Sequence, residues 1–325
     1  MPVPRYRQIN QQTKNYYHIY SRCVQQERLC GYDPKTCKDY SHRKAYMLKR
    51  LYLLVSIFPV DLASHSILDD HYHLALFHKP ERVDQWDDET VVRLWLTLHK
   101  GPPFMRRWFN GEKLSQNESD QVESQIHAWR DKLKTLSYFM KCFNEKLSKE
   151  FNKESDKTGA FWEKRFCSKE LNSEADLIKC MSYVDLNPVH AGIANNPDES
   201  EYTSFREREQ KAYIQSDIIS QGLEDGEGDT LANYGIPVKW LMPFKDQIES
   251  EEHSHIEFTY TDYREFVYWV GQIERPDKGT IKTRPKLAEQ MRINESDFES
   301  VKRRFQVYRQ DLISVNASSH LTDSG

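Results

Sequence analysis

VDLASHSILDDHYHLALF, at residues 60–77, is the stretch that decides the fold. It contains two short runs typical of β-strands, Val60–Leu68 and His71–Phe77. The two acidic residues between them, Asp69 and Asp70, suit a tight hairpin turn or a bulge. The stretch therefore predicts two neighbouring strands of a sheet.

Further strand and helix patterns lie on both sides of this hairpin. Asn15–Val24 is rich in tyrosine and β-branched residues, which predicts a first strand. Arg43–Phe58 carries apolar residues at helical spacing and stops at Pro59, which predicts a helix. Downstream, the patterns predict helices over 88–99, 133–151, 174–183 and 261–273, a loop insertion over 101–125, and a short strand over 159–166.

The composition excludes several classes of protein. The chain has 325 residues, which allows about two domains. Only 12 residues are glycine, which argues against a Gly-rich dinucleotide fold and against a barrel with many tight βα loops. There is no run of 18 apolar residues and no apolar signal core at the N-terminus. We therefore expect no membrane span and no secretion, and we predict a cytoplasmic location.

Charge is distributed unevenly along a mildly acidic chain, whose net charge is −4. The segment from Lys132 to Lys169 contains ten basic and five acidic residues, a net charge of +5. Between Asp217 and Asp229 there are five acidic residues and no basic one. We predict a main domain over residues 1–205, an acidic linker over 206–235, a small helical domain over 236–313 and a disordered tail over 314–325.

His71 and His73 are the first candidate site residues. Residues i and i+2 of a strand point to the same face, so the two imidazoles would lie side by side, with Tyr72 turned to the opposite face. Two neutral imidazoles can bind one divalent metal ion. The alternative is a strand in which both histidines are structural. A second pair, His253 and His255, lies in an acidic stretch and is typical of a surface loop.

Tyr183 is the second candidate. It lies near the end of a predicted helix, and Asn187 follows at i+4, so the two side chains share one helix face. A phenol with an ordinary pKa of about 10 is a weak nucleophile. A metal ion that polarises the electrophile or stabilises the phenolate lowers that barrier. A helical tyrosine alone is more commonly a core residue, so this hypothesis depends on its combination with the histidines.

The cysteines have two interpretations. Cys23, Cys30 and Cys37 recur every seven residues, with His42 soon after, which would allow a structural zinc site. Paired Cys-x-x-Cys spacing is missing, however, and a loop with buried or idle thiols is the alternative. The six cysteines of a cytoplasmic chain are expected to be free thiols.

Three segments, taken in order, resemble one known family. They are His71-Tyr-His73, GAFWEKRF at residues 159–166 and YVDLNPVHAG at residues 183–192. Together they resemble the REP-associated tyrosine transposases, relatives of the single-tyrosine insertion-sequence transposases within the HUH nuclease superfamily. The resemblance covers roughly residues 6–205, with a weaker match at 262–271. The LNPV-x-AG part is its most specific element.

The resemblance implies an α+β fold of the HUH nuclease type, with a ferredoxin-like antiparallel sheet flanked by helices and a mainly helical C-terminal extension. It also implies cleavage and rejoining of single-stranded DNA, often at hairpin-forming repeats, by a monomer or homodimer. His71 and His73 match the metal-binding pair, and Asn187 matches a third polar ligand. Tyr183 matches the nucleophile, which forms a 5′-phosphotyrosine and releases a 3′-OH. The metal ion would be Mg²⁺ or Mn²⁺, completed by water and a phosphate oxygen.

With DNA as the partner, a basic helix face and a nearby aromatic segment become candidate contacts for the phosphate backbone and the bases. A solvated helix face and a buried aromatic cluster around Phe161 are the alternatives. The candidate residues are Lys134, Lys141, Lys146, Lys149, Trp162 and Arg165.

The chain departs from the family pattern at two places. Asp69-Asp70 stands where relatives have Pro-Asn, and His190 stands where arginine is common. Two other functions are therefore kept open. One is a domesticated protein of the same fold that binds DNA hairpins without cleaving them. The other is a barrel-type metal hydrolase, which would need further His and Asp ligands and more Gly-rich loops than this chain offers.

Overall fold

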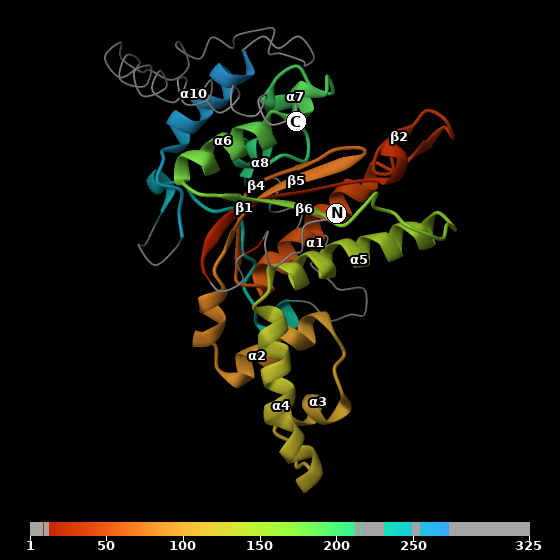
Figure 1. Ribbon diagram of the computed structural model, residues 1–325, viewed down its shortest axis with the longest axis vertical. Helices are drawn as coiled ribbons and strands as arrows, with labels where there is room; N and C mark the ends of the chain where they lie inside the picture. Colours follow the sequence, from red (N-terminus) through yellow and green to blue (C-terminus); the bar gives the residue numbers. More distant parts are fainter. Residues whose placement is uncertain (1–8, 10–12, 212–214, 216–230, 249–253, 273–325) are drawn as a thin grey trace, which may run out of the picture.

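A four-stranded antiparallel sheet in the order β4-β5-β1-β6 forms the middle layer of the molecule. The computed structural model describes residues 9, 13–211, 215, 231–248 and 254–272. Helices cover both faces of the sheet (Figure 1). The α+β class and the antiparallel sheet flanked by helices are confirmed. The strands are β1 (Asn15–Arg22), β4 (Val60–Ile67), β5 (His71–His78) and β6 (Cys167–Leu171), with a separate pair β2 (Tyr32–Asp33) and β3 (Lys38–Asp39).

The predicted hairpin is present as β4 and β5. Its turn contains Asp69 and Asp70, and the backbone N–H of Leu68 donates to the carbonyl oxygen of His71 at 2.8 Å. On its other side β5 pairs along its whole length with β1, so that Arg22 lies opposite His71. The hairpin therefore occupies the centre of the sheet at β5 and one edge at β4.

Side chains of β5 point alternately to the two faces of the sheet, and each face packs into a separate hydrophobic core. Tyr72, Leu74 and Leu76 are fully buried in the larger core, together with apolar residues of α1 and α5. Ala75 belongs to the smaller core on the opposite face, together with α6 and α10. Because alternate residues share a face, both candidate histidines lie on the α6 side of the sheet.

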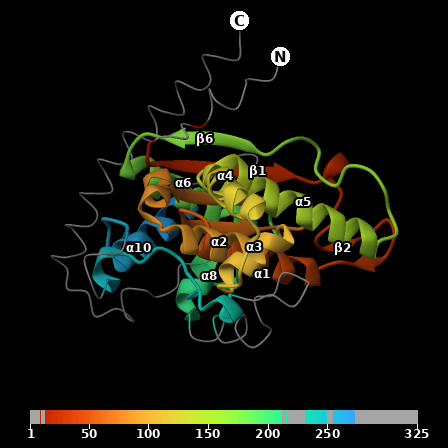
Figure 2. The same cartoon turned by 90° about the horizontal axis from the view of Figure 1, so that it is seen from below.

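Most of the helices fall into three groups, one on each face of the sheet and a third formed by α2, α3 and α4. In Figure 1, α1 and α5 lie on one side of the sheet, and α6 and α10 on the other. Figure 2 shows α2, α3 and α4 in front of the remaining layers. The helices are α1 (His42–Ile57), α2 (Asp88–Leu98), α3 (Pro103–Phe109), α4 (Gln116–Leu133), α5 (Leu136–Glu154), α6 (Glu174–Asp185), α7 (Asn187–His190), α8 (Ser204–Glu209) and α10 (Tyr260–Gly271), with 3-10 helices at Val24–Gln26, Pro80–Gln85, Pro197–Glu199, Ala232–Tyr234 and Lys245–Gln247.

Two local predictions are wrong, and one predicted helix begins later than expected. The segment 101–125 is not a loop, because α3 and α4 form there, and α4 begins with a capping box of Ser115 and Glu118. The helix predicted over 133–151 is present as α5 but begins at Leu136, because α4 ends at Leu133 and Thr135 caps α5 by accepting the N–H of Tyr138. The segment 159–166 contains one isolated bridge, at Trp162, and the strand follows at β6.

The described C-terminal segments pack on the main domain. The boundary predicted at residue 206 falls inside α8, whose Glu207 is 2% exposed. Leu241 forms a bridge with Leu62 of β4, and α10 shares the smaller core with α6. The tail predicted over 314–325, most of the linker and the last part of the predicted 236–313 domain lie outside the described residues. None of the helices that the structure describes is long and apolar enough to cross a bilayer.

Candidate active site

The two histidines of β5 lie side by side beneath α6. The centroids of their rings are 5.2 Å apart, and the rings are nearly perpendicular, at 88°. His73 is 7% exposed and the side chain of His71 is 13% exposed. Tyr72 points to the opposite face, where its hydroxyl donates to Asn144 on α5 at 2.8 Å. The pair is therefore partly shielded from solvent at the hairpin end of the sheet.

Tyr183 and Asn187 approach the histidines from the helical layer above. Ser173 caps the start of α6, and the last turn of this helix directs Tyr183 toward the sheet. The ring of Tyr183 packs edge-on against His73, with 5.4 Å between the centroids. Asn187 Oδ1 lies 3.0 Å from His71 Nε2. The structure thus brings together the four residues that the resemblance assigned to catalysis and metal binding.

His71 and Asn187 are spaced as two ligands of one cation. His71 Nδ1 lies 2.6 Å from Asp70 Oδ1, and in the tautomer that donates its Nδ1–H to this carboxylate, Nε2 carries a lone pair toward Asn187 Oδ1. Two acceptors at this distance need a proton or a cation between them. Neighbouring ligands of an octahedral ion, with bonds of about 2.1 Å, are separated by about 3.0 Å. The observed 3.0 Å separation fits such an ion.

The donor set for a metal ion is small. Within the described part of the chain, no group of three or more His, Cys, Asp or Glu side chains is placed to hold a metal ion. A cation here would have His71, His73 and Asn187 as its protein ligands. Water and a phosphate oxygen would complete its shell, a mixture that Mn²⁺ and Mg²⁺ accept.

Comparisons with known proteins give one structural similarity. No protein-family model matches the sequence, and no curated protein is similar enough to count as a relative. A solved structure of the REP-associated tyrosine transposase bound to a REP hairpin is similar to this chain, with 10% sequence identity and a TM-score of 0.29. The match covers 75% of this chain and 93% of that one. A similarity this low shows neither a family nor an activity.

His18 is a site residue that the sequence patterns did not single out. Its Nε2 lies 2.9 Å from His73 Nδ1, and the two rings are stacked at 5.1 Å. Burial, together with the charge of Lys169, lowers the pKa of His18 to about 4, so this imidazole is neutral at neutral pH. Because His18 occupies Nδ1 of His73, Nε2 is the nitrogen that a metal ion would use.

A second phenol also borders the pair. The ring of Tyr20 lies 5.6 Å from that of His73, and Tyr20 is 39% exposed. A hydrogen bond with Cys167, together with burial, raises the pKa of Tyr20. A raised pKa leaves less of this phenol ionised at neutral pH, and the Tyr20 side chain is partly exposed to solvent.

The turn residue Asp70 orients His71. Burial raises the pKa of Asp70, but the hydrogen bond from His71 and the nearby charges of His71 and Arg22 outweigh it and lower the pKa below its ordinary value. Asp70 therefore stays ionised and keeps the proton on Nδ1 of His71. Asp70, one of the two acidic residues that differ from the family pattern, thus orients His71.

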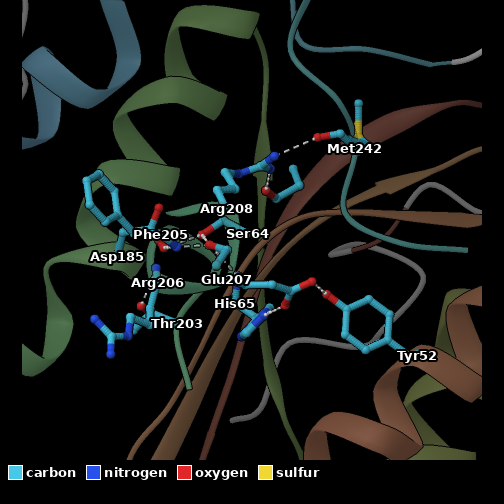
Figure 3. Close-up of polar contacts among 12 residues, drawn as sticks. Tyr52, Ser64, His65, Asp185, Thr203, Phe205, Arg206, Glu207, Arg208 and Met242 are labelled. Carbon is cyan, nitrogen blue, oxygen red and sulfur yellow. Dashed lines mark hydrogen bonds and ion pairs between the residues drawn. The ribbon is translucent and has the colours of Figure 1, made fainter. Parts of the chain in front are cut away.

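A buried carboxylate anchors the end of α6 that carries Tyr183 (Figure 3). Asp185 is fully buried and accepts the hydroxyl of Ser204 at 2.5 Å, the N–H of Phe205 at 3.1 Å and the hydroxyl of Tyr263 at 2.5 Å. Burial raises the pKa of Asp185, and the hydrogen bonds from Ser204 and Tyr263 oppose that rise. Asp185 therefore ties α6 to α8 and α10.

The same network reaches α1. Glu207 of α8 accepts the hydroxyl of Tyr52 at 2.5 Å and contacts Nε2 of His65 at 3.0 Å (Figure 3). Arg208 donates to the carbonyl oxygens of Ala63 and Met242, at 2.9 Å and 3.0 Å. These contacts fix α8 against β4 and against the C-terminal segment.

The lysines of α5 lie on the face of the sheet away from the histidines. This helix packs on the Tyr72 side, as the hydrogen bond from Tyr72 to Asn144 shows. The structure therefore does not bring these lysines to Tyr183. Each has an acidic partner one turn away: Lys141 and Lys149 pair with Glu145 at 3.9 Å and 2.6 Å, and Lys146 pairs with Glu150 at 3.5 Å.

The remaining predicted DNA contacts are scattered. Lys134 lies beyond the end of α4 and pairs with Asp84 at 2.7 Å. The indole N–H of Trp162 donates to the carbonyl oxygen of Asn144 at 3.1 Å, and Trp162 and Lys149 line a cavity of about 350 Å³. Arg165 is exposed. The neighbouring Phe161 is 3% exposed, so the alternative of a buried aromatic cluster holds there.

The cysteines do not form a metal site. Cys23 and Cys30 are buried, whereas Cys37 is exposed and directed to the carbonyl oxygen of Pro34. All six cysteines are free thiols, as predicted.

Proposed function

We propose that this chain is a metal-dependent enzyme that cleaves and rejoins single-stranded DNA through a covalent bond to Tyr183. The observation that carries the proposal is the convergence of Tyr183 and Asn187 on the histidine pair, from a different layer of the fold. A purely structural histidine pair would not require a phenol and an amide oxygen at its edge. The sequence resemblance to REP-associated tyrosine transposases supports the same assignment.

The proposed step is a transesterification. The phenol oxygen of Tyr183 attacks the phosphorus, and its proton passes to solvent. The P–O3′ bond breaks, and the leaving oxygen takes up a proton to become a free 3′-OH. The product, a 5′-phosphotyrosine, retains a phosphodiester bond, so a 3′-OH can reverse the step without ATP. A divalent cation held by His71, His73 and Asn187 would stabilise the negative charge on the phosphate and on the phenolate.

The ferredoxin-like form of the fold is part of the proposal. The order β1-α1-β4-β5-α5-β6 along the chain, with the strands arranged β4-β5-β1-β6, supports it. Hairpin-forming DNA as the substrate, a monomer or homodimer as the active form and a cytoplasmic location are proposed with it, from the sequence alone.

A labelled hairpin oligonucleotide with single-stranded flanks tests the proposal. We expect cleavage with Mg²⁺ or Mn²⁺ and none with EDTA. Tyr183→Phe should abolish cleavage while hairpin binding persists, whereas Tyr20→Phe should retain cleavage. Binding without cleavage by the unaltered chain would support the non-cleaving hairpin-binding protein. Cleavage that survives Tyr183→Phe would contradict the proposal.

A further inference from the structure

Three exposed side chains form a strip beside the tyrosine site. Lys169 of β6 and Arg22 at the end of β1 are both exposed, and the half-exposed Tyr20 lies between them. We call Lys169, Tyr20 and Arg22 the β1–β6 strip. The register places all three on one face, because Lys169 is opposite His18 and Arg22 is opposite His71.

The strip lies on the same face as the candidate active site. Tyr20 is directly opposite His73 in the register, and the two rings are 5.6 Å apart. The charge of Lys169 acts on both His18 and Cys180, so Lys169 lies near β1 and α6 at once. The strip therefore lies beside His18 and His73, which both contact the ring of Tyr183.

Neither cation of the strip forms an ion pair with a described residue, although the charge of Arg22 acts on Asp70 at longer range. No ion pair joins Lys169 or Arg22 to a carboxylate anywhere in the described chain. The α5 lysines differ, since each already has a glutamate one turn away. An unpaired cation binds a phosphate without first breaking an ion pair.

The spacing suits an extended nucleic acid strand. Four residues of β1 separate the positions of His18 and Arg22, about 14 Å at 3.4 Å per residue. The phenol ring of Tyr20, which is 39% exposed, lies between the two cations. Cations that follow a backbone, with an aromatic ring on which a base stacks, are the common arrangement in proteins that bind single strands.

We propose that the β1–β6 strip holds the single-stranded DNA next to the scissile phosphate: Lys169 and Arg22 bind backbone phosphates, and Tyr20 stacks on a base. This inference rests on the proposed function, and it assigns the DNA contact to residues other than the α5 lysines. Tyr20 then positions the substrate and is not the nucleophile.

Binding of a fluorescent single-stranded oligonucleotide over a range of salt concentrations tests the strip. The measurement is made in a Tyr183→Phe background, so that cleavage does not interfere. For the double variant Arg22→Gln/Lys169→Gln we expect about tenfold weaker binding at 0.1 M salt and a salt slope reduced by about 1.4. Tyr20→Leu should weaken binding about tenfold and leave the salt slope unchanged. The three side chains are exposed, so the melting temperatures should stay close to that of the parent.

Two further variants make the test selective. Arg93→Gln, which removes a partly exposed cation of α2 that pairs with Glu89, should bind like the parent. Lys141→Gln/Lys149→Gln compares the α5 face directly. An unchanged affinity and salt slope in the strip variants, or a loss confined to the α5 variants, would overturn the inference and leave the proposed function intact. If the parent binds no oligonucleotide, the proposed function and the inference fail together.

Discussion

At the scale of single residues, the site is organised by the partners of its histidines. Asp70 holds Nδ1 of His71 at 2.6 Å, and His18 holds Nδ1 of His73 at 2.9 Å. Both imidazoles are therefore held in orientation through Nδ1. Hydrogen bonds of this kind raise the affinity of histidines for metal ions.

Asp70→Asn tests this role. The amide cannot accept the Nδ1–H as strongly as the carboxylate does, so His71 loses its fixed tautomer. We expect the affinity for Mn²⁺, measured by calorimetry, to fall by about 10- to 100-fold. Asp69→Asn is the matched control, because Asp69 pairs with Lys44 at 2.6 Å and not with a histidine. Equal affinities in the two variants would show that Asp70 does not orient a ligand.

At the scale of elements, α6 holds Tyr183 in place because its last turn is anchored from two sides. Asp185 accepts hydrogen bonds from α8 and from Tyr263 on α10, and it is completely shielded from solvent. A buried acceptor that loses one donor destabilises the fold by about 1–3 kcal/mol. The position of Tyr183 thus depends on α8 and α10 as well as on α6.

Tyr263→Phe removes only the hydroxyl that binds Asp185. We expect the free energy of unfolding to fall by about 1–3 kcal/mol. DNA cleavage should slow while hairpin binding is retained, because Tyr183 is positioned less well. Tyr260→Phe is the control, since its hydroxyl binds Glu209 in an exposed contact. Similar losses in both variants would argue against a special role of the Asp185 contact.

The contact between α2 and α5 predicts a pH dependence. His99 is hydrogen-bonded to Tyr138 at 3.0 Å, and burial and nearby positive charges lower its pKa to about 4. The unfolded chain takes up a proton near pH 6.5, and the folded chain only near pH 4. Stability should be complete above pH 6.5 and decrease from there to pH 4, by at most about 1.4 kcal/mol per pH unit for one histidine. His99→Gln should flatten this slope in thermal melts; an unchanged slope would contradict the assignment.

At the scale of the whole molecule, the sequence predicted what depends on local spacing. The hairpin at 60–77, the His71/His73 pair and the Tyr183/Asn187 pair all follow from periods of two or four residues. The role of His18 depends on the register of β1 against β5, which spacing within one segment does not reveal. The same holds for the α5 lysines, since the face on which a helix packs is set by tertiary contacts. Helix α4 was missed although its capping box and the helical spacing of its buried Val122, Ile126, Trp129 and Leu133 mark it, because the residues between them are mostly polar.

The C-terminal segment should be needed for folding. Met242, Phe244 and Phe266 are at most 2% exposed and belong to the core under α6. Each buried side chain of this size contributes about 1.5–3 kcal/mol. A chain ending at residue 235 should therefore be insoluble or lack a cooperative thermal transition. A cooperative transition at the temperature of the full chain would show that residues 1–235 fold independently.

The most direct test of the account is the mass of the protein after incubation with a cleavable hairpin oligonucleotide and Mn²⁺. The account predicts a denaturation-resistant adduct, heavier by the 3′ fragment of the oligonucleotide, that maps to the peptide containing Tyr183 and is absent in Tyr183→Phe. Cleavage without an adduct, or an adduct on Tyr20, would contradict it.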